Sequence, residues 1–163
     1  YIEYAIVIEE LARVDPSVGL IVAAHNSLCS NHIFIAGNES QKHHYIPKLA
    51  SGEWIGCWSL TEPEAGSDAG GTRSTAVRQG EGWLLNGGKT FTTNAHYADV
   101  CVAMFVTDRS ASQHGISAFV IEKDTPGFRV GKKENKLGMR ASATALVIKA
   151  SASKAISPPR SKT

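Results

Sequence analysis

Cysteine is scarce in this sequence, and its positions carry no metal or disulfide pattern. The chain has three cysteines, Cys29, Cys57 and Cys101, which lie far apart with no C-x-x-C spacing. We therefore expect neither a disulfide framework nor a zinc site. We expect the three cysteines to be small buried thiols in a reducing compartment. Excess charge is also lacking, because the net charge is only +2 with no long basic run. This balance argues against a nucleic-acid partner.

Sequence signals of a membrane span, a Rossmann site and a metal site are absent as well. No uninterrupted apolar run reaches the ~18 residues typical of a membrane span, and no G-x-G-x-x-G stands between a strand and a helix to indicate a Rossmann site. The six histidines include no H-x-x-x-H pair beside a carboxylate. The adjacent His43 and His44 would project ~100° apart on a helix, so we predict no metal. The chain begins without Met or a leader, and we expect its natural start to lie upstream.

The first third of the chain has helical periodicity. Ile2 to Arg13 repeats apolar residues at helical spacing, which predicts a helix with one buried stripe. Asp15 is a good N-cap and Pro16 suits a first helical position, so a second helix should run from Ser17 to Ala36. This second segment is apolar on most sides. We therefore expect it to be buried on more than one face.

From Trp54 the pattern changes to short strands separated by glycine-containing turns. The predicted strands are Trp54–Leu60, Thr75–Arg78, Trp83–Asn86, Lys89–Thr93, Val100–Thr107, Ile116–Glu122 and Thr144–Ile148. Asn86-Gly87-Gly88 is a candidate hairpin turn between two of them. Many short strands at close spacing predict antiparallel pairing in a barrel or sandwich.

We therefore predict an α+β fold, in which helical segments precede an antiparallel β-barrel domain. Residues 1–52 would form a partial N-terminal α-helical domain, and residues 53–148 the middle β-barrel domain. The last helical segment, Ser40 to Ala50, carries Pro47, whose ring would kink or restart the helix. Residues 149–163 are rich in Ser, Ala, Lys and Pro, which predicts a disordered or loosely attached tail.

The stretch from Cys57 to Asp68 is the best candidate for a ligand loop. An apolar strand breaks off at Thr61-Glu62-Pro63, because proline has no N–H for a strand ladder. Ala65-Gly66-Ser67-Asp68 then offers successive backbone N–H groups and short polar side chains, which suit a phosphate or a flat heteroaromatic ring. A plain strand-to-loop turn without a ligand fits the composition equally well.

Three blocks resemble the acyl-CoA dehydrogenase family. The first is its flavin loop, T-E-P followed by two variable residues and G-S-D, present at Leu60–Asp68. The second, N-G-x-K running into an aromatic residue and x-T-N, is present at Asn86–Asn94. The third comprises Asp124–Phe128 and Lys136–Ser142. The resemblance extends to about Val147, which is most of the chain.

The resemblance implies FAD as the cofactor, held by the β domain and its loops. Thr61 would bond the pyrimidine edge of the flavin and Thr93 would bond near N5, while Phe91 would take the aromatic position beside the ring. Ser67 would lie between the cofactor phosphate and the substrate CoA. The residues implied in cofactor binding are Trp58, Ser59, Leu60, Thr61, Gly66, Ser67, Phe91, Thr92 and Thr93. The plainer interpretation of Thr61 and Thr93 is ordinary strand threonine.

The reaction implied by the resemblance removes a proton from the α-carbon of an acyl-CoA thioester and passes a hydride from the β-carbon to flavin N5. In the family the base is a glutamate of a later helical domain, which this chain does not reach. We therefore assign no catalytic residue here and expect the chain alone to be inactive. Glu62 is expected to be structural and Glu64 variable.

The resemblance also implies acyl-CoA and an electron-transfer flavoprotein as partners, a homotetramer or homodimer, and the bacterial cytoplasm or mitochondrial matrix as the compartment. Two alternatives remain open. One is a flavin- or CoA-binding fragment that catalyses nothing. The other is a relative with different chemistry on the same scaffold, such as an acyl-CoA oxidase or a nitroalkane oxidase, and peroxide formed together with product would distinguish an oxidase.

Overall fold

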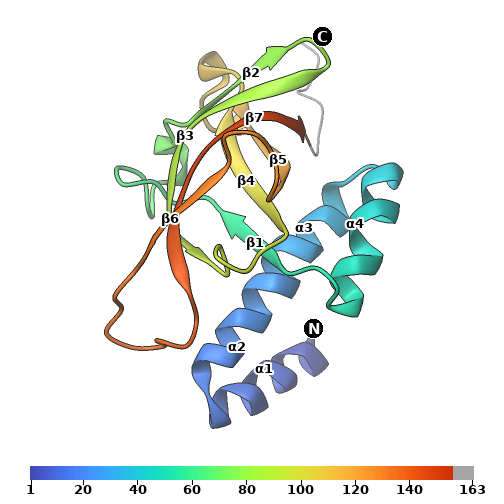
Figure 1. Cartoon of the computed structure of the whole chain (residues 1–163), viewed down its shortest axis with the longest axis vertical. Helices are drawn as coiled ribbons and strands as arrows, with labels where there is room; N and C mark the ends of the chain where they lie inside the picture. The colour runs from blue at the N-terminus through green and yellow to red at the C-terminus, as the bar shows by residue number, and fades with distance from the viewer. Residues whose placement is uncertain (156–163) are drawn as a thin grey trace.

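A computed structural model describes the backbone of residues 1–155 and the side chains of residues 1–147. Helices come first and a sheet follows, as Figure 1 shows, so the chain is α+β. The helices are α1 (Ile2–Val14), α2 (Pro16–Ala23), the π-helix η1 (Ala24–Ser30), α3 (Asn31–Ala36) and α4 (Glu39–Ser51), with short 3-10 turns η2 (Ala69–Gly71) and η3 (Arg109–Gly115). The strands are β1 (Gly56–Ser59), β2 (Thr75–Gln79), β3 (Gly82–Thr93), β4 (Val100–Val106), β5 (Ile116–Glu122), β6 (Arg129–Lys133) and β7 (Thr144–Ala155).

The second helix starts where the sequence predicts. Asp15 is the N-cap of α2, its carboxylate accepts a hydrogen bond from the N–H of Ser17 at 2.7 Å, and Pro16 follows as the first helical residue. From there α2, η1 and α3 form one continuous helix from Pro16 to Ala36. By length and composition this helix could cross a membrane, although core helices of soluble proteins pass the same test.

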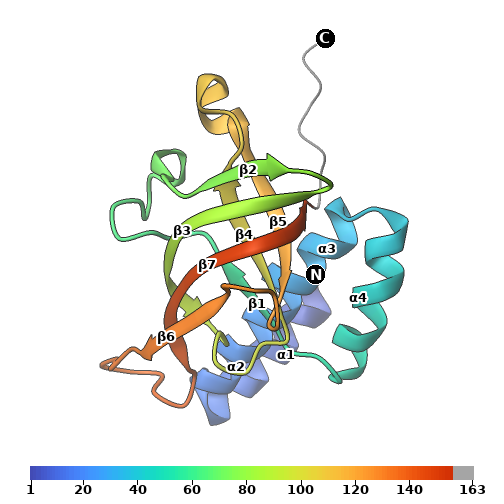
Figure 2. The same cartoon turned by 45° about the horizontal axis from the view of Figure 1, so that its top comes forward.

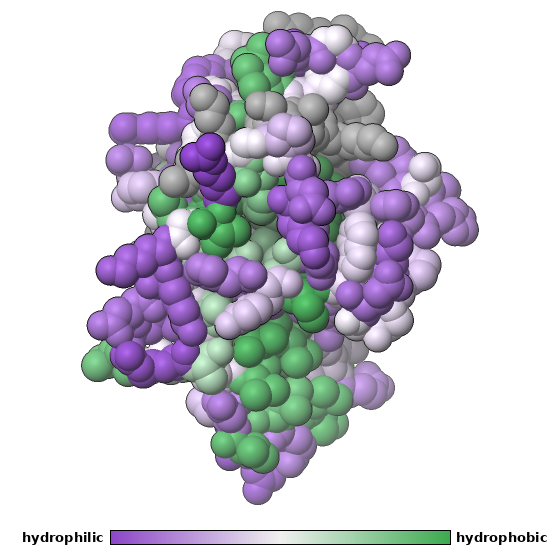
Figure 3. All heavy atoms as spheres, viewed as in Figure 1, coloured by the Kyte–Doolittle hydropathy of each residue, from purple (hydrophilic) through white to green (hydrophobic). Residues whose placement is uncertain are grey.

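The expectation that this helix is buried on more than one face is wrong. Ile33 is fully buried, but the neighbouring Phe34 and Ile35 are 62% and 67% exposed. One side of the helix packs on the sheet, and α1 and α4 contact parts of it, but several of its apolar side chains stay exposed. Exposed apolar side chains of α1 and α2 continue this surface, and Figure 3 shows them gathered at the helical end of the molecule.

Helix α4 is a single helix rather than two pieces. Asn38 and Gln41 form a capping box at its start, each side chain accepting from the other's backbone N–H at 2.9 and 3.0 Å. The helix continues through Pro47 to Ser51 without restarting. His43 and His44 are both exposed on it.

The sheet has seven strands and is mixed, which corrects the predicted antiparallel barrel. Most pairs are antiparallel, but β1 and β2 both run parallel to β4. The connections are long enough for this, because residues 60–99 lie between β1 and β4 and residues 80–99 lie between β2 and β4. Parallel strands need a connection of about a dozen residues or more. Since β2 meets β4 at one residue pair, Thr75 with Val106, continuous ladders do not close the sheet into a barrel.

Strand β3 differs most from the sequence prediction. It runs unbroken from Gly82 to Thr93, so Asn86-Gly87-Gly88 is no hairpin turn, and the turn lies between β2 and β3 instead. Register shifts against β7 fall at Trp83/Leu84, Leu85/Gly88 and Lys89/Thr92, and the last two mark two bulges in β3. Figure 2 shows β3 and β7 running side by side across the sheet.

Two further differences concern the later strands. The sequence analysis missed β6, whose five residues alternate little in hydrophobicity and, among the described strands, pair only with β7. Strand β7 continues to Ala155, so residues 149–155 form a strand where the composition predicts a loose tail. The rest of that predicted tail, 156–163, lies outside the described residues.

Strand β4 is buried along its whole length and separates two halves of the core. One half lies between the sheet and the helices and includes Cys29, Ile33, Leu49 and Val102. The other lies on the opposite face of the sheet around Phe119. The three cysteines are free and buried, as expected, and burial raises the pKa of the Cys29 thiol.

Candidate functional site

Five of the nine residues predicted to contact the cofactor, Trp58, Leu60, Thr61, Phe91 and Thr93, line one cavity. Its volume is about 170 Å³, and it lies between η1, the end of β1 and the end of β3. It is lined by Ala24, Leu28, Trp58, Leu60, Thr61, Thr90, Phe91 and Thr93. Two segments that lie about 30 residues apart in the chain therefore meet at this cavity. Two motifs must meet in this way if they are to hold one ligand.

The first wall forms where β1 leaves the sheet. Strand pairing with β4 stops at Ser59, and Leu60 and Thr61 follow in irregular backbone. The carbonyl of Thr61 accepts a hydrogen bond from the N–H of Thr90 at 2.7 Å, which fixes this segment against β3. Within residues 1–155, the hydroxyl of Thr61 has no hydrogen-bond partner and is free to bond a ligand.

The second wall comes from the bulge at the end of β3. Between Lys89 and Thr92 the pairing with β7 shifts, so Thr90 and Phe91 stand outside the regular ladder and line the cavity. Phe91 has a left-handed backbone, with φ at 56°, and its side chain is 66% exposed. Bulges and strained residues of this kind re-aim side chains and cluster at functional sites. The Thr93 hydroxyl, like that of Thr61, has no partner within the described residues.

The third wall is the π-helix η1, which contributes Ala24 and Leu28. Its position against β1 is set by His25, whose Nδ1 accepts from the N–H of Gly56 at 2.9 Å. The Nε2–H of the neutral ring then donates to the carbonyl of Leu49 at 3.0 Å. Gly56 is required here, since a Cβ would stand 2.6 Å from the sulfur of Cys29. Short π-helical segments are often found at functional sites.

Asn94 closes the same junction from β3. Its φ is 69°, a conformation that asparagine tolerates, and its side-chain amide donates to the carbonyls of Ile21 at 3.1 Å and Gly56 at 3.4 Å. One buried side chain therefore ties α2, β1 and β3 together. The sequence analysis included Asn94 in a motif but assigned it no role.

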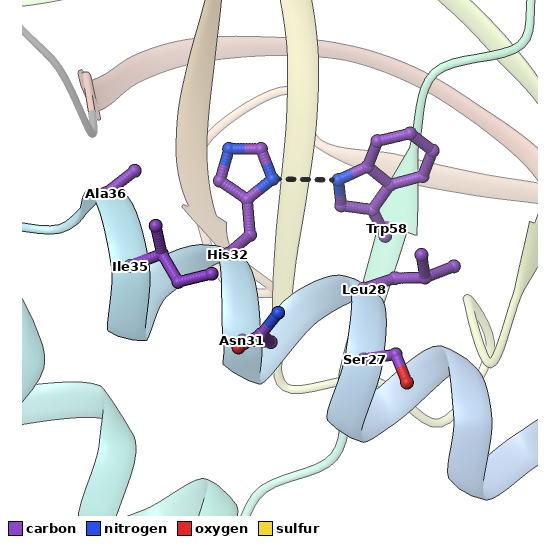
Figure 4. A pocket seen from close by; sticks show the side chains of 7 residues that line it. All are labelled: Ser27, Leu28, Asn31, His32, Ile35, Ala36 and Trp58. Carbon is purple, nitrogen blue, oxygen red and sulfur yellow. Dashed lines mark hydrogen bonds between the residues drawn. The ribbon is translucent and has the colours of Figure 1, made fainter. Parts of the chain in front are cut away.

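A second cavity of about 290 Å³ adjoins the first and shares Leu28 and Trp58 with it. Figure 4 shows the indole of Trp58 facing His32, with its Nε1–H donating to the ring Nδ1 at 3.3 Å. Burial lowers the pKa of His32 and so favours the neutral ring that can accept this bond. His32 thereby holds Trp58 as a wall between the two cavities.

Four predicted cofactor residues do not line the cavity. Ser59 and Thr92 are buried, their hydroxyls hydrogen-bond each other at 2.7 Å, and Cys101 donates to Ser59 at 3.5 Å. Both side chains therefore face the core, and only their backbone is available to a cofactor. Gly66 and Ser67 are exposed on the loop that follows Thr61.

Behind the cavity wall lies an ion pair that sequence reasoning missed. Lys89 is 1% and Glu62 is 4% exposed, and the Lys89 Nζ lies 2.6 Å from the Glu62 Oε1. Burial disfavours the charged carboxylate, but hydrogen bonds from Lys89, Ser74 and Arg73 outweigh it and lower the pKa of Glu62. Burial lowers the pKa of Lys89, and the pairing with Glu62 partly opposes this.

The chemistry of the cavity suits holding a ring rather than transferring a proton. Its lining is apolar and aromatic with free threonine hydroxyls, and it includes no carboxylate, histidine or cysteine. Glu62 is fully engaged in the ion pair, as a structural role requires. Among residues 1–155, no group of His, Cys, Asp or Glu could hold a metal ion.

Comparison with known proteins identifies the family. The model of the acyl-CoA dehydrogenase middle domain matches residues 57–150, and that of the acyl-CoA dehydrogenase N-terminal domain matches residues 1–53. The chain belongs to the acyl-CoA dehydrogenase family. An acyl-CoA dehydrogenase of Bacillus subtilis is 48% identical over 147 residues, which is 90% of this chain. Mitochondrial acyl-CoA dehydrogenases of mammals match over a similar span.

Solved structures agree with this assignment. A chain from a structure of the electron transferring flavoprotein of Acidaminococcus fermentans superposes with a TM-score of 0.90 and 42% identity, covering 93% of this chain and 41% of that one. A glutaryl-CoA dehydrogenase of Mycobacterium smegmatis in complex with FADH2 gives a TM-score of 0.79 and 38% identity, covering 88% and 36%. The chain spans only 39% of the length of its Bacillus subtilis relative.

Proposed function

We propose that this chain supplies the flavin-binding wall of an FAD-dependent acyl-CoA dehydrogenase that carries out α,β-dehydrogenation of acyl-CoA thioesters. The observation that supports it best is the convergence of Trp58, Thr61, Phe91 and Thr93 on one cavity. A relative with 38% identity is described in complex with FADH2. FAD, when bound, supplies the hydride acceptor.

The residues of the cavity fit such a ring. The unpartnered hydroxyls of Thr61 and Thr93 are suited to bond the pyrimidine edge and the region of N5, respectively. Phe91 and Trp58 supply flat apolar surfaces that exclude water from the ring. The cavity of about 170 Å³ is smaller than the ~300–1,000 Å³ of a complete ligand pocket, so this surface holds one side of the ring only.

The roles of the loop residues and partners belong to the same proposal. Exposed Gly66 and Ser67 would contact the cofactor pyrophosphate, and Ser67 would also face the CoA of the substrate. We propose an electron-transfer flavoprotein as the electron acceptor, supported by the similar chain in such a structure. Family resemblance further supports a homotetramer or homodimer, in the bacterial cytoplasm or the mitochondrial matrix.

The test uses the protein expressed from its complete reading frame and loaded with FAD. Anaerobic mixing with saturated acyl-CoA thioesters of different chain lengths should bleach the long-wavelength flavin band and form enoyl-CoA. A flavin band that stays unchanged with every thioester would contradict the proposal. Peroxide produced in stoichiometry with enoyl-CoA under air would assign the protein to the oxidases instead.

A further inference from the structure

The Glu62–Lys89 pair lies directly behind the cavity, and its contacts go beyond those of a core ion pair. We propose that Glu62 and Lys89 are positioning residues that hold Leu60 and Thr61 in place and thereby set the affinity of the cavity for flavin. The inference rests on the proposed function only where it names flavin as the ligand. The positioning itself is a property of this chain.

One ammonium group holds both neighbours of Thr61. The Nζ of Lys89 donates to the carbonyl of Leu60 at 3.1 Å and to the carboxylate of Glu62 at 2.6 Å. The next residue of β3, Thr90, donates its N–H to the carbonyl of Thr61 itself at 2.7 Å. Two consecutive residues of β3 therefore fix three consecutive residues at the cavity wall.

The carboxylate of Glu62 holds the far end of the loop. It accepts hydrogen bonds from the N–H of Arg73 at 2.7 Å and the N–H of Ser74 at 3.1 Å, just before β2 begins. The tight turn from Glu62 to Ala65, closed by hydrogen bonds of 2.9 and 3.2 Å, follows directly. The same pair thus closes both ends of the loop that carries Gly66 and Ser67.

Core stability alone does not require charges at these positions. A buried ion pair loses solvation, and well-packed apolar residues often replace such a pair with no loss of stability. Apolar side chains, however, cannot donate to the Leu60 carbonyl or accept from the Arg73 and Ser74 N–H groups. What the pair supplies beyond packing is therefore a fixed backbone geometry at the cavity.

The first readout is the dissociation constant of FAD, measured by flavin fluorescence with the 163-residue chain. Lys89→Met removes the donor but leaves the Glu62 charge unpaired, so its effect mixes folding with positioning. The double variant Glu62→Gln with Lys89→Met removes both charges and keeps one acceptor oxygen, in the place of Oε2, for the N–H groups of Arg73 and Ser74. We expect the double variant to bind FAD about tenfold more weakly, the order expected for one lost hydrogen bond to a positioned group.

The second readout needs no flavin. Amide hydrogen exchange of Thr90 reports its bond to the Thr61 carbonyl, and we expect it to be at least about tenfold faster in the double variant. The amide of Val102, in the fully buried β4, should be unchanged. Lys42→Met, which breaks the exposed Lys42–Glu39 pair, is the matched control and should change neither readout.

The outcomes separate this inference from the proposed function. A wild-type chain that shows no saturable FAD binding contradicts the flavin site, and Thr90 exchange alone then decides the positioning role. A double variant with unchanged FAD affinity or unchanged Thr90 exchange overturns the inference. If the double variant does not fold, Glu62→Gln alone carries the same test, because it weakens the bond to Lys89 while keeping the other contacts, and unchanged values in it overturn the inference too.

Discussion

At the scale of single residues, the alternation of side chains along β1 explains why one motif residue there does not reach the cavity. Trp58 and Leu60 line it, whereas Ser59 between them is buried against Thr92. A family motif is contiguous in sequence, but successive strand side chains point to opposite faces. Period-two reasoning would have placed Ser59 on the face opposite Trp58, whereas the bulge before Thr92 interrupts the alternation in β3. The tertiary ion pair of Glu62 and Lys89 has no such local signal.

Replacing the two free hydroxyls should weaken flavin binding without unfolding the chain. Thr61→Val and Thr93→Val keep shape and remove one bond each, so we expect each to raise the FAD dissociation constant about fivefold to tenfold. Flavin fluorescence titration measures this. Thr125→Val, outside the cavity, serves as the control. Unchanged affinity in the variant lacking both hydroxyls would show that they do not contact the flavin.

Glu62 should make stability depend on pH in acid. The pKa of Glu62 is lowered below its ordinary 4.5 in the folded chain. Its contribution is therefore present above pH 4.5 and is lost as the pH falls through the folded pKa. Urea unfolding at pH 7 should show Glu62→Gln to be about 3 kcal/mol less stable than wild type. The difference should shrink as the pH falls below 4.5 and through the lowered pKa of Glu62, and a difference independent of pH would refute this account.

At the scale of elements, the cavity is built from departures from regular structure. A π-helix, a strand end and a β-bulge each contribute a wall. The sequence predicts the strand end, because Pro63 stops pairing locally. It does not predict the π-helix or the bulge, since both arise from contacts to distant residues such as the bonds of His25 to Gly56 and Leu49.

The first bulge of β3, between Leu85 and Gly88, predicts that residue 87 must be glycine. Gly87 has φ at 145°, and a Cβ there would overlap the Ser74 side chain and lie 2.8 Å from its Cα. We expect Gly87→Ala to lower the free energy of unfolding by about 3 kcal/mol through strain and overpacking. The neighbouring Gly88→Ala, whose Cβ would meet only the Val147 carbonyl at 3.8 Å, should cost about 0.5 kcal/mol or less. Equal effects in urea denaturation would contradict the bulge geometry.

At the scale of the whole molecule, the order of helices before strands was predictable from hydrophobic periodicity, but the sheet topology was not. Short apolar stretches indicate which residues form strands, yet they do not show which strands pair or whether two neighbours run parallel. The strands β1 and β4 pair in parallel although they lie far apart in the sequence, and no local pattern indicates the direction in which they pair. The same limit applies to the exposed side of the helix from Pro16 to Ala36, whose apolar composition predicts burial.

The chain alone should not catalyse dehydrogenation. No carboxylate lines the cavity, and Glu62 is committed to Lys89, so no base is available there for α-proton removal. General acid-base catalysis is worth ~10²–10⁴ in rate. Anaerobic mixing of the FAD-loaded chain with acyl-CoA thioesters should leave the flavin absorbance unchanged. Rapid bleaching would reveal a base among these residues, with Glu62 and Glu64 the first to replace.

The location of the flavin tests the central claim most directly. A crystal structure of the chain grown with FAD should show the flavin ring against Trp58, Thr61, Phe91 and Thr93, within hydrogen-bond distance of both threonine hydroxyls. The ion pair of Glu62 and Lys89 should be intact behind it. A flavin ring bound at any other surface, with this cavity filled only by water, would contradict the account.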